Sequence, residues 1–457
     1  MKITTHLDYQ TILANQPAPI YFALRLEAST QSAARPMPAA FCLVLDRSGS
    51  MGGKPIQGAK EAAQVAIRNL RPNDLFSVVV FADAARTLIP LQSATNKQPF
   101  LQAVSEIQSG GSTNLTGGWM LGRDELLKAP AGHTRRVLLL SDGHLNVGII
   151  EPAQVRQIVT DGLEQGAIRT SSLGFGDGYN EDLLAEVATA TGGVFYDAVS
   201  PEKFPAIFNA ELDGLQKLSA QNVRLRLKRL DFCEEYLPLG EYPSVSLPDG
   251  RHEFAVGDLV SSEERIVVFA LSVLPLPMVG GQPVVSLEGE QLLELELAYD
   301  EIAAEGISSK TFTQIIRIQS TQDPAKVVLN QEVIPWVALQ RAGKVMQQAV
   351  QHLDAGREPA ALRLLLEARE ALQRYGVSSE VKEAVDSLTQ IIGRIERGEW
   401  DIRARKSSRY RSSSLRKMSS HDHWCAEEAA PSFKQQPLPS APPAPEPPAT
   451  PPTTEPK

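Results

Sequence analysis

Residues 41–51 read FCLVLDRSGSM: an apolar run ends in an aspartate and two serines at alternate positions, Asp46, Ser48 and Ser50. The apolar part is continuous, which is typical of a strand buried on both faces. Its polar end has two explanations. Either these side chains cap the helix that follows, or they form part of an ion site. The choice depends on which other polar residues the fold brings to the same place.

Similar apolar runs recur further along the chain, with helix patterns between them. The runs cover 76–81, 137–140, 171–175 and 194–196, and the helix patterns cover 54–70, 98–108, 117–128, 151–165, 181–191 and 205–218. Repeated alternation of strand and helix predicts a doubly wound, mostly parallel α/β sheet with helices on both faces. We place this domain at residues 38–218.

The rest of the chain has other patterns. Alternating polar and apolar residues with intervening Gly and Pro predict an antiparallel β-sandwich over 219–325. A similar run at 20–28 suggests that the N-terminal strands of 1–37 join this sandwich, so that the α/β domain is inserted into it. Residues 330–400 carry three helix patterns. A basic, serine-rich stretch and a proline-rich end predict a disordered tail over 401–457.

Composition excludes several functional classes. The chain has 457 residues, 42% of them hydrophobic, a net charge of −9 and three cysteines. Net negative charge disfavours nucleic acid and anionic membranes as partners. Three scattered cysteines cannot form a disulfide framework. No apolar run is long enough for a membrane span, and the N-terminus lacks a signal-peptide pattern, so we expect a cytoplasmic protein.

Two further loops would meet Asp46, Ser48 and Ser50 at the carboxyl edge of the predicted sheet. Asp142 follows the run at 137–140, and Thr113 lies in the loop GGSTN at 110–114. Ligands of open α/β sheets bind at this edge. All these donors are oxygens, which suits a hard divalent cation such as Mg²⁺, with Mn²⁺ and Ca²⁺ left open. Because hydroxyl ligands neutralise no charge, the ion would favour a carboxylate supplied by another molecule.

The same residues resemble the metal-ion-dependent adhesion site of von Willebrand factor type A domains, with Asp46-x-Ser48-x-Ser50, Thr113 and Asp142-Gly143 in matching order. The resemblance implies a Rossmann-like fold. It also implies that both serines and Thr113 touch Mg²⁺, while the aspartates act through water or enter the coordination shell. The layout resembles that of some intracellular bacterial and plant proteins, which carry this domain beside a β-sandwich and a helical C-terminal part. Arg47 departs from the small or apolar residue common at its position, and it either points away or adds a charge beside the ligand carboxylate.

Other readings of these motifs explain less. Helix capping does not account for Thr113 and Asp142. A haloacid dehalogenase-type phosphatase needs a second acid where this chain has Ser48. Ser48 as a hydrolase nucleophile lacks an assignable histidine. In the tail, we expect His421–Cys425 to be an incidental cluster rather than a metal site, whereas the basic residues before Ser412–Ser414 leave phosphorylation open.

The sequence therefore predicts a non-enzymatic protein-interaction module. In this module an Asp or Glu side chain of a partner protein completes the coordination of Mg²⁺. The alternative is a recruiting subunit of an enzyme assembly, either ATPase- or chelatase-like or a kinase or phosphatase signalling complex. The chain has no GxxxxGK[ST] loop, so any nucleotide hydrolysis would take place in trans.

Overall fold

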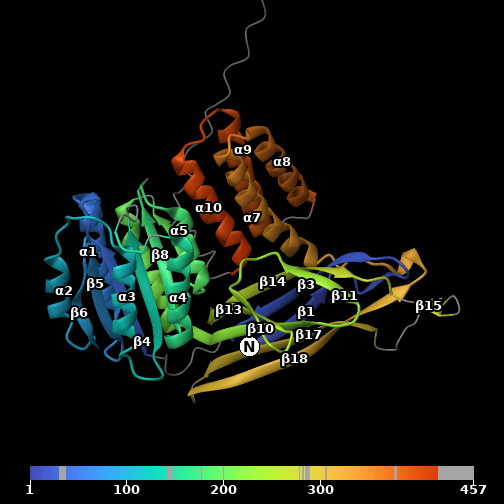
Figure 1. Ribbon diagram of the computed structural model, residues 1–457, viewed down its shortest axis with the longest axis horizontal. Helices are drawn as coiled ribbons and strands as arrows, with labels where there is room; N and C mark the ends of the chain where they lie inside the picture. Colours follow the sequence, from blue (N-terminus) through green and yellow to red (C-terminus); the bar gives the residue numbers. More distant parts are fainter. Residues whose placement is uncertain are drawn as a thin grey trace, which may run out of the picture.

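The protein consists of an α/β domain, a β-sandwich and a helical bundle that lies against both (Figure 1). This computed structural model describes residues 1–29, 38–141, 147–149, 151–176, 178–198, 200–276, 278–279, 282–283, 289–303, 306–374 and 378–419.

The α/β domain is built on a six-stranded sheet with the order β6-β5-β4-β7-β8-β9. All neighbours are parallel except the edge pair β5 and β6. Its strands are β4 (Ala39–Asp46), β5 (Leu75–Phe81), β6 (Ala85–Ser93), β7 (Thr134–Ser141), β8 (Ile168–Phe175) and β9 (Phe195–Ala198). Its helices are α1 (Lys54–Asn69), α2 (Gln98–Ser105), α3 (Leu115–Leu126), α4 (Pro152–Gly166), α5 (Glu181–Ala190) and α6 (Phe204–Gln216). The doubly wound α/β fold expected from the alternating pattern is confirmed.

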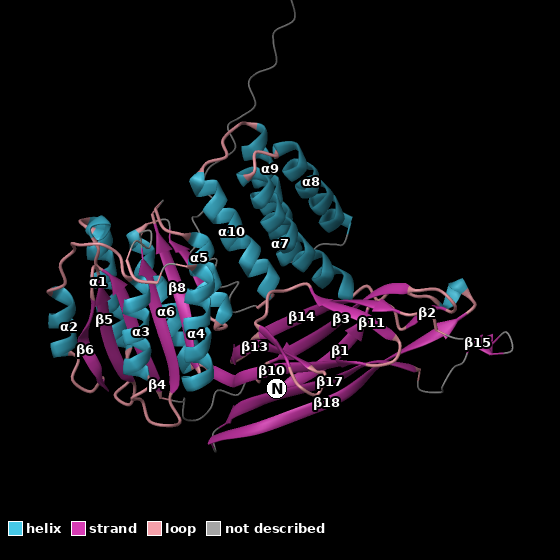
Figure 2. Cartoon of the chain, viewed as in Figure 1, coloured by secondary structure: helices cyan, strands magenta, loops and turns pink. Residues whose placement is uncertain are grey.

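The continuous apolar runs become the central strands because helices cover both faces of the sheet (Figure 2). Every residue of β4 is buried, and α1 packs against α6 while α3 packs against α4. The antiparallel strand β6 was not anticipated from the sequence. It lies at the edge of the sheet and is only partly buried, so it has no continuous apolar run.

The β-sandwich has two sheets, with orders β1-β3-β14-β11 and β12-β13-β10-β17-β18-β2. The first contains β1 (Lys2–Leu7), β3 (Ala18–Glu27), β14 (Glu264–Val273) and β11 (Cys233–Pro238). The second contains β12 (Ser244–Ser246), β13 (His252–Val260), β10 (Leu218–Arg229), β17 (Glu290–Ala303), β18 (Gly306–Thr321) and β2 (Thr11–Leu13). A separate short pair is formed by β15 (Met278–Val279) and β16 (Gln282–Pro283). Because β3 pairs with β14 along its whole length, strands from before and after the α/β domain share one sheet.

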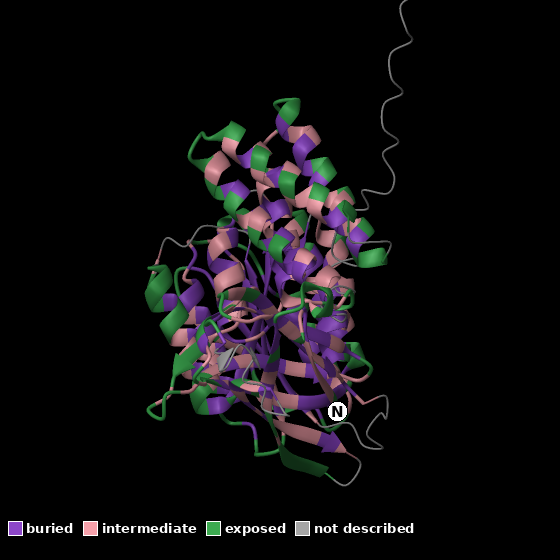
Figure 3. Cartoon of the chain, turned by 90° about the vertical axis from the view of Figure 1, so that its right-hand side faces the viewer, coloured by how far each residue is buried: buried purple, intermediate pink, exposed green. Residues whose placement is uncertain are grey.

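Four helices form the C-terminal bundle: α7 (Val333–Asp354), α8 (Glu358–Arg374), α9 (Ser379–Glu396) and α10 (Ile402–Lys417). Its interior is apolar, and its outward helix faces are exposed (Figure 3). The bundle rests on the sandwich through α7, where Val333 and Val337 pack with Ile266 and Val268 of β14.

Helix α10 corrects one expectation. Residues 401–457 were expected to be disordered, but 402–417 form a helix that packs against α7, α9, α5 and β9. Helix α10 has no single apolar face, because it packs against polar groups on several sides. Ser412, for example, donates a hydrogen bond to the carbonyl of Gly343 in α7 (2.8 Å). The cluster His421–Cys425 and the proline-rich end lie outside the described residues.

Within the described part of the chain, none of the helices combines the length and the apolar composition that crossing a bilayer requires.

Candidate metal site

Asp46 is the last residue of β4 and is fully buried. Both oxygens of its carboxylate accept hydrogen bonds: Oδ1 from the backbone N–H of Ser48 (2.8 Å) and Oδ2 from the hydroxyl of Ser141 (2.7 Å). The Asp46 side chain is therefore held in one orientation at the carboxyl edge of the sheet.

Ser48 and Ser50 bring two hydroxyl oxygens together just after this strand. Ser50 lies in the 3-10 turn Gly49–Met51 and is exposed, whereas Ser48 is buried. Their Oγ atoms are 3.1 Å apart. Two adjacent ligands of an octahedral Mg²⁺ ion, each about 2.1 Å from the metal, lie about 3.0 Å apart. The spacing of the two hydroxyls thus fits neighbouring positions on such an ion.

The loop that carries Thr113 is joined by backbone hydrogen bonds to the loop that carries Ser48 and Ser50, which is called the serine loop below. Gly110 N–H donates to the carbonyl of Arg47 (2.7 Å), and Gly49 N–H donates to the carbonyl of Gly111 (2.9 Å). Gly111 has a φ of +90°, and a Cβ at this position would lie 2.2 Å from Oδ2 of Asp83. Glycine is therefore required here for both the backbone conformation and the space. These bonds place Thr113, which is buried, at the same edge as Asp46.

The third loop follows β7. Asp142 lies outside the described residues, but Ser141 before it and Val147 after the gap are both described. Ser141 donates to Asp46, and Val147 N–H donates to the carbonyl of Thr113 (3.3 Å). Both flanks of the loop that contains Asp142 therefore contact the other two loops.

Two residues of this site were not singled out from the sequence. Ser141 orients the carboxylate of Asp46. The sequence signal for Ser141 is that it is the last residue of a central strand. Asp83 follows β5 at the same edge, and its Oδ1 accepts a hydrogen bond from Ser112 N–H (2.9 Å). The signal available for Asp83 was its place just beyond the apolar run at 76–81, as Asp46 follows the run at 41–45.

The pKa values of Asp46 and Asp83 are shifted in opposite directions. Burial raises the pKa of Asp46, although hydrogen bonds from Ser48 and Ser141 oppose this shift. Hydrogen bonds from Ser112 lower the pKa of Asp83. A nearby cation would favour the ionised form of either carboxylate.

Arg47 stands on the rim between the two loops. Its side chain is half-buried and donates from Nη1 to the carbonyl of Gln108 (3.4 Å). The positive charge of Arg47 lowers the pKa of Asp83 further, after the hydrogen bonds from Ser112. This arginine therefore lies along the edge of the site, with its charge close to that of Asp83.

The described residues contain no group of three or more His, Cys, Asp or Glu side chains suited to a metal. The described side chains around Asp46 instead combine hydroxyl oxygens with a carboxylate. The donors assembled around Asp46 are of that type, and they fit a hard divalent cation better than a soft one.

Residues 41–210 match the family model of the von Willebrand factor type A domain. This segment is a von Willebrand factor type A domain. Among curated proteins, sll0103 of Synechocystis sp. is 25% identical over 332 residues, which cover 70% of this chain and 76% of that protein. A shorter match, to YfbK of Escherichia coli, is 25% identical over 171 residues and covers 37% of this chain and 30% of that protein.

Solved structures extend the similarity beyond the von Willebrand factor type A domain. A von Willebrand factor type A protein from Catenulispora acidiphila superposes with a TM-score of 0.67 at 17% identity, over 85% of this chain and 89% of that chain. The ArnB paralog VWA2 from Sulfolobus acidocaldarius superposes with a TM-score of 0.60 at 14% identity, over 91% of this chain and 98% of that chain. At these identities the similarity concerns the fold alone, and it includes the sandwich and the bundle.

Proposed function

We propose that this protein is a non-enzymatic, metal-dependent interaction module. Von Willebrand factor type A domains are generally protein-interaction modules, which supports this class of function for residues 41–210. The observation that carries the proposal is the joining of Asp46, Ser48 and Ser50 to the Thr113 loop at one edge of the sheet.

In this proposal Ser48, Ser50 and Thr113 would hold Mg²⁺ directly, while Asp46 and Asp142 would act through water or enter the coordination shell. When bound, the ion supplies a Lewis-acidic position for a carboxylate of a partner protein. The protein's own contribution is to orient the donors. Asp46 is fixed from both sides by Ser48 and Ser141, and the bonds from Gly49 and Gly110 fix the distance between the loops. Arg47 would add attraction for an acidic partner segment at the rim.

Calorimetric titration of the metal-free full-length protein with Mg²⁺ tests the site. We expect one bound ion per chain, and we expect Asp46→Ala and Ser50→Ala each to weaken the affinity by about 10–100-fold. The matched control is Asp124→Ala, which removes an exposed acid of α3 in the same domain. Equal affinities in wild type, Asp46→Ala and Asp124→Ala would contradict the proposed site.

Capture of partners from native lysate tests the interaction. Wild type and Asp46→Ala are compared in Mg²⁺ and in EDTA, with the retained proteins identified by mass spectrometry. A partner retained by wild type in Mg²⁺ alone supports coordination through its acidic side chain. Retention of the same partners under all four conditions would show that other surfaces carry the binding.

A further inference from the structure

Helix α10 is unusual because it is both highly polar and largely enclosed. It contacts α7 and α9 of the bundle on one side, and α5 and β9 of the von Willebrand factor type A domain on the other. Its buried residues are Ala404, Lys406, Ser408, Tyr410, Ser412, Ser413 and Arg416. A helix of this composition is stable in such a position only where its charges have partners.

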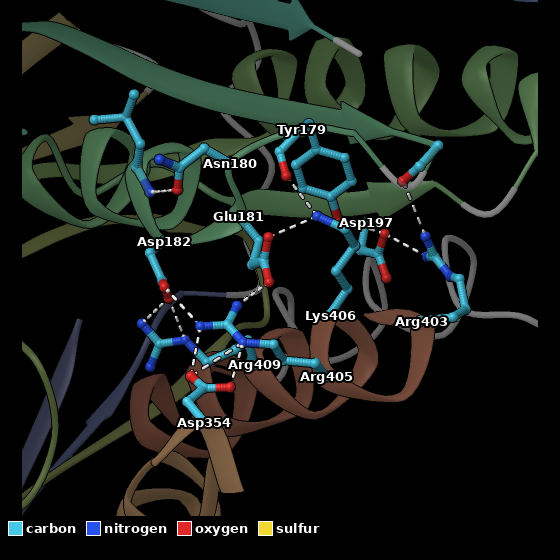
Figure 4. Close-up of polar contacts among 12 residues, drawn as sticks. Tyr179, Asn180, Glu181, Asp182, Asp197, Asp354, Arg403, Arg405, Lys406 and Arg409 are labelled. Atoms are coloured by element: carbon cyan, nitrogen blue, oxygen red, sulfur yellow. Dashed lines mark hydrogen bonds and ion pairs between the residues drawn. The ribbon is translucent and has the colours of Figure 1, made fainter. Parts of the chain in front are cut away.

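The partners are acids that belong to different parts of the molecule (Figure 4). Arg403 pairs with Asp197 of β9 at 2.5 Å. Arg405 pairs with Asp182 of α5 at 3.1 Å and with Asp354 of α7 at 2.8 Å, so it bridges the α/β domain and the bundle. Helix α10 thus ties the two together through ion pairs.

Lys406 is the most enclosed of these cations, with a side chain that is 0% exposed. Its Nζ donates to Oε2 of Glu181 (2.6 Å) and to the backbone carbonyl of Tyr179 (2.5 Å), and it lies 3.6 Å from the centroid of the Tyr179 ring. The Tyr179 hydroxyl in turn donates to Asp197 (2.6 Å). Docked α10 therefore contacts Tyr179 at its ring and its backbone carbonyl, while Asp197 of β9 holds the hydroxyl.

A short series of contacts leads from Tyr179 to the candidate metal site. The Tyr179 ring covers Gly174 of β8 so closely that a Cβ on Gly174 would lie 2.3 Å from the ring. Gly174 pairs with Ser141 in the parallel ladder of β7 and β8. Ser141 orients the carboxylate of Asp46. The buried lysine of α10 and the buried aspartate of the site are thus joined through three intervening residues.

We propose that two events favour each other: the docking of α10 against the von Willebrand factor type A domain, and the binding of a divalent cation at the Asp46 site. This inference rests on the proposed function. The two states are α10 docked and α10 released. In the docked state Lys406 holds Tyr179 against β8, and the end of β7 keeps Ser141 in position for Asp46. Coupling between two binding events is reciprocal, so the cation must also stabilise the docked helix.

The test uses the full-length protein and the variants Lys406→Met and Arg403→Gln. Lys406→Met leaves Glu181 paired with Arg405, so no acid is left buried alone. Arg403→Gln is the milder change because the Arg403 side chain is 25% exposed, and it replaces Lys406→Met if that variant does not fold. The matched control is Arg411→Met on the same helix, where Arg411 donates to Gln390 of α9 within the bundle.

Two quantities are measured: the affinity for Mg²⁺ by calorimetry, and hydrogen exchange of residues 402–417 by mass spectrometry. We expect Lys406→Met to speed exchange in 402–417 and to weaken Mg²⁺ binding by at least about fivefold, with less than about a twofold change for Arg411→Met. Saturating Mg²⁺ should slow exchange in α10 of wild type by a similar factor and should have no effect in Asp46→Ala.

The outcomes separate the two proposals. Faster exchange in Lys406→Met with an unchanged Mg²⁺ affinity would overturn the coupling and leave the metal site intact. Absence of Mg²⁺ binding by wild type would instead overturn the proposed function, and the coupling with it. Slower exchange of α10 in Mg²⁺ for both wild type and Asp46→Ala would show that the ion acts on the helix elsewhere, which also overturns the coupling.

Discussion

At the scale of single residues, Asp8 is a buried acid. It is 3% exposed, and its Oδ1 accepts a hydrogen bond from Tyr21 N–H (2.7 Å). Burial raises its pKa from 3.8 to about 6, although backbone hydrogen bonds oppose the shift. A folded-state pKa above the unfolded one means that the protonated acid favours folding. Asp8 therefore favours the fold below pH 3.8, and this contribution is lost as the pH rises through about 6.

We expect Asp8→Asn to remove this pH dependence, because the amide oxygen can still accept from Tyr21 N–H and carries no charge. Above pH 6 the variant should be more stable than wild type by at most about 3 kcal/mol, and the difference should shrink towards pH 4. Urea unfolding at pH 4 and pH 7.5 measures this difference in stability. The control is Asp213→Asn, which changes an exposed acid. A gain that is the same at both pH values would rule out titration of Asp8 as the cause.

At the scale of secondary-structure elements, the edge strand β6 depends on one side chain of a neighbouring helix. Glu125 of α3 is 4% exposed and accepts hydrogen bonds from Leu91 N–H (2.9 Å) and the Thr87 hydroxyl (3.1 Å) of β6. Burial would raise the pKa of Glu125, but Lys128 and these hydrogen bonds outweigh it and the pKa is lowered. The ionised carboxylate is thus the form that binds β6.

We expect Glu125→Ala to destabilise the protein by about 1–3 kcal/mol, because it leaves the Leu91 N–H of β6 without its acceptor. Hydrogen exchange should accelerate in residues 85–93 before it does in the central strands. Lys128→Ala is the control, because it removes only an exposed partner of Glu125 and should cost less than about 1 kcal/mol. Unchanged exchange in β6 of Glu125→Ala would mean that pairing with β5 alone holds this strand.

At the scale of the whole molecule, buried charges join the von Willebrand factor type A domain to the sandwich. Asp258 of β13 accepts from Nε of Arg169 in β8 (2.6 Å) and lies 3.8 Å from Arg136 of β7. Burial lowers the pKa of Arg169, and Asp258 counteracts this shift. The charged form of Arg169 at the interface is therefore stabilised by an acid from the other part of the chain.

We expect Asp258→Ala to cost about 3–5 kcal/mol, since it leaves Arg169 buried without its carboxylate. Denaturant unfolding followed by a probe in each part should show the two parts separating before either unfolds. The control is Glu186→Ala, which breaks an exposed pair with Arg156 and should cost less than about 1 kcal/mol. Similar losses in both variants would show that the interface does not depend on this pair.

Much of the α/β domain follows from local sequence. The run at 41–45 is apolar without interruption because β4 is buried on both faces, and that pattern is visible in the residues themselves. Asp46, Ser48 and Ser50 lie within five residues of one another, and a strand followed by a turn brings them together without help from the rest of the chain. The sequence by itself therefore determined the doubly wound fold and the serine loop of the candidate site.

Only the tertiary structure decided the features that depend on partners distant in the chain. Helix α10 has no apolar stripe, and its order rests on Glu181, Asp182 and Asp354, which are contributed by two other helices. The hydrogen bond from Ser141 to Asp46 and the pairing of Arg169 with Asp258 are likewise set by which strands become neighbours. A charged or hydroxyl side chain looks the same in sequence whether it faces water or a buried partner, because local periodicity reports only the burial of apolar groups.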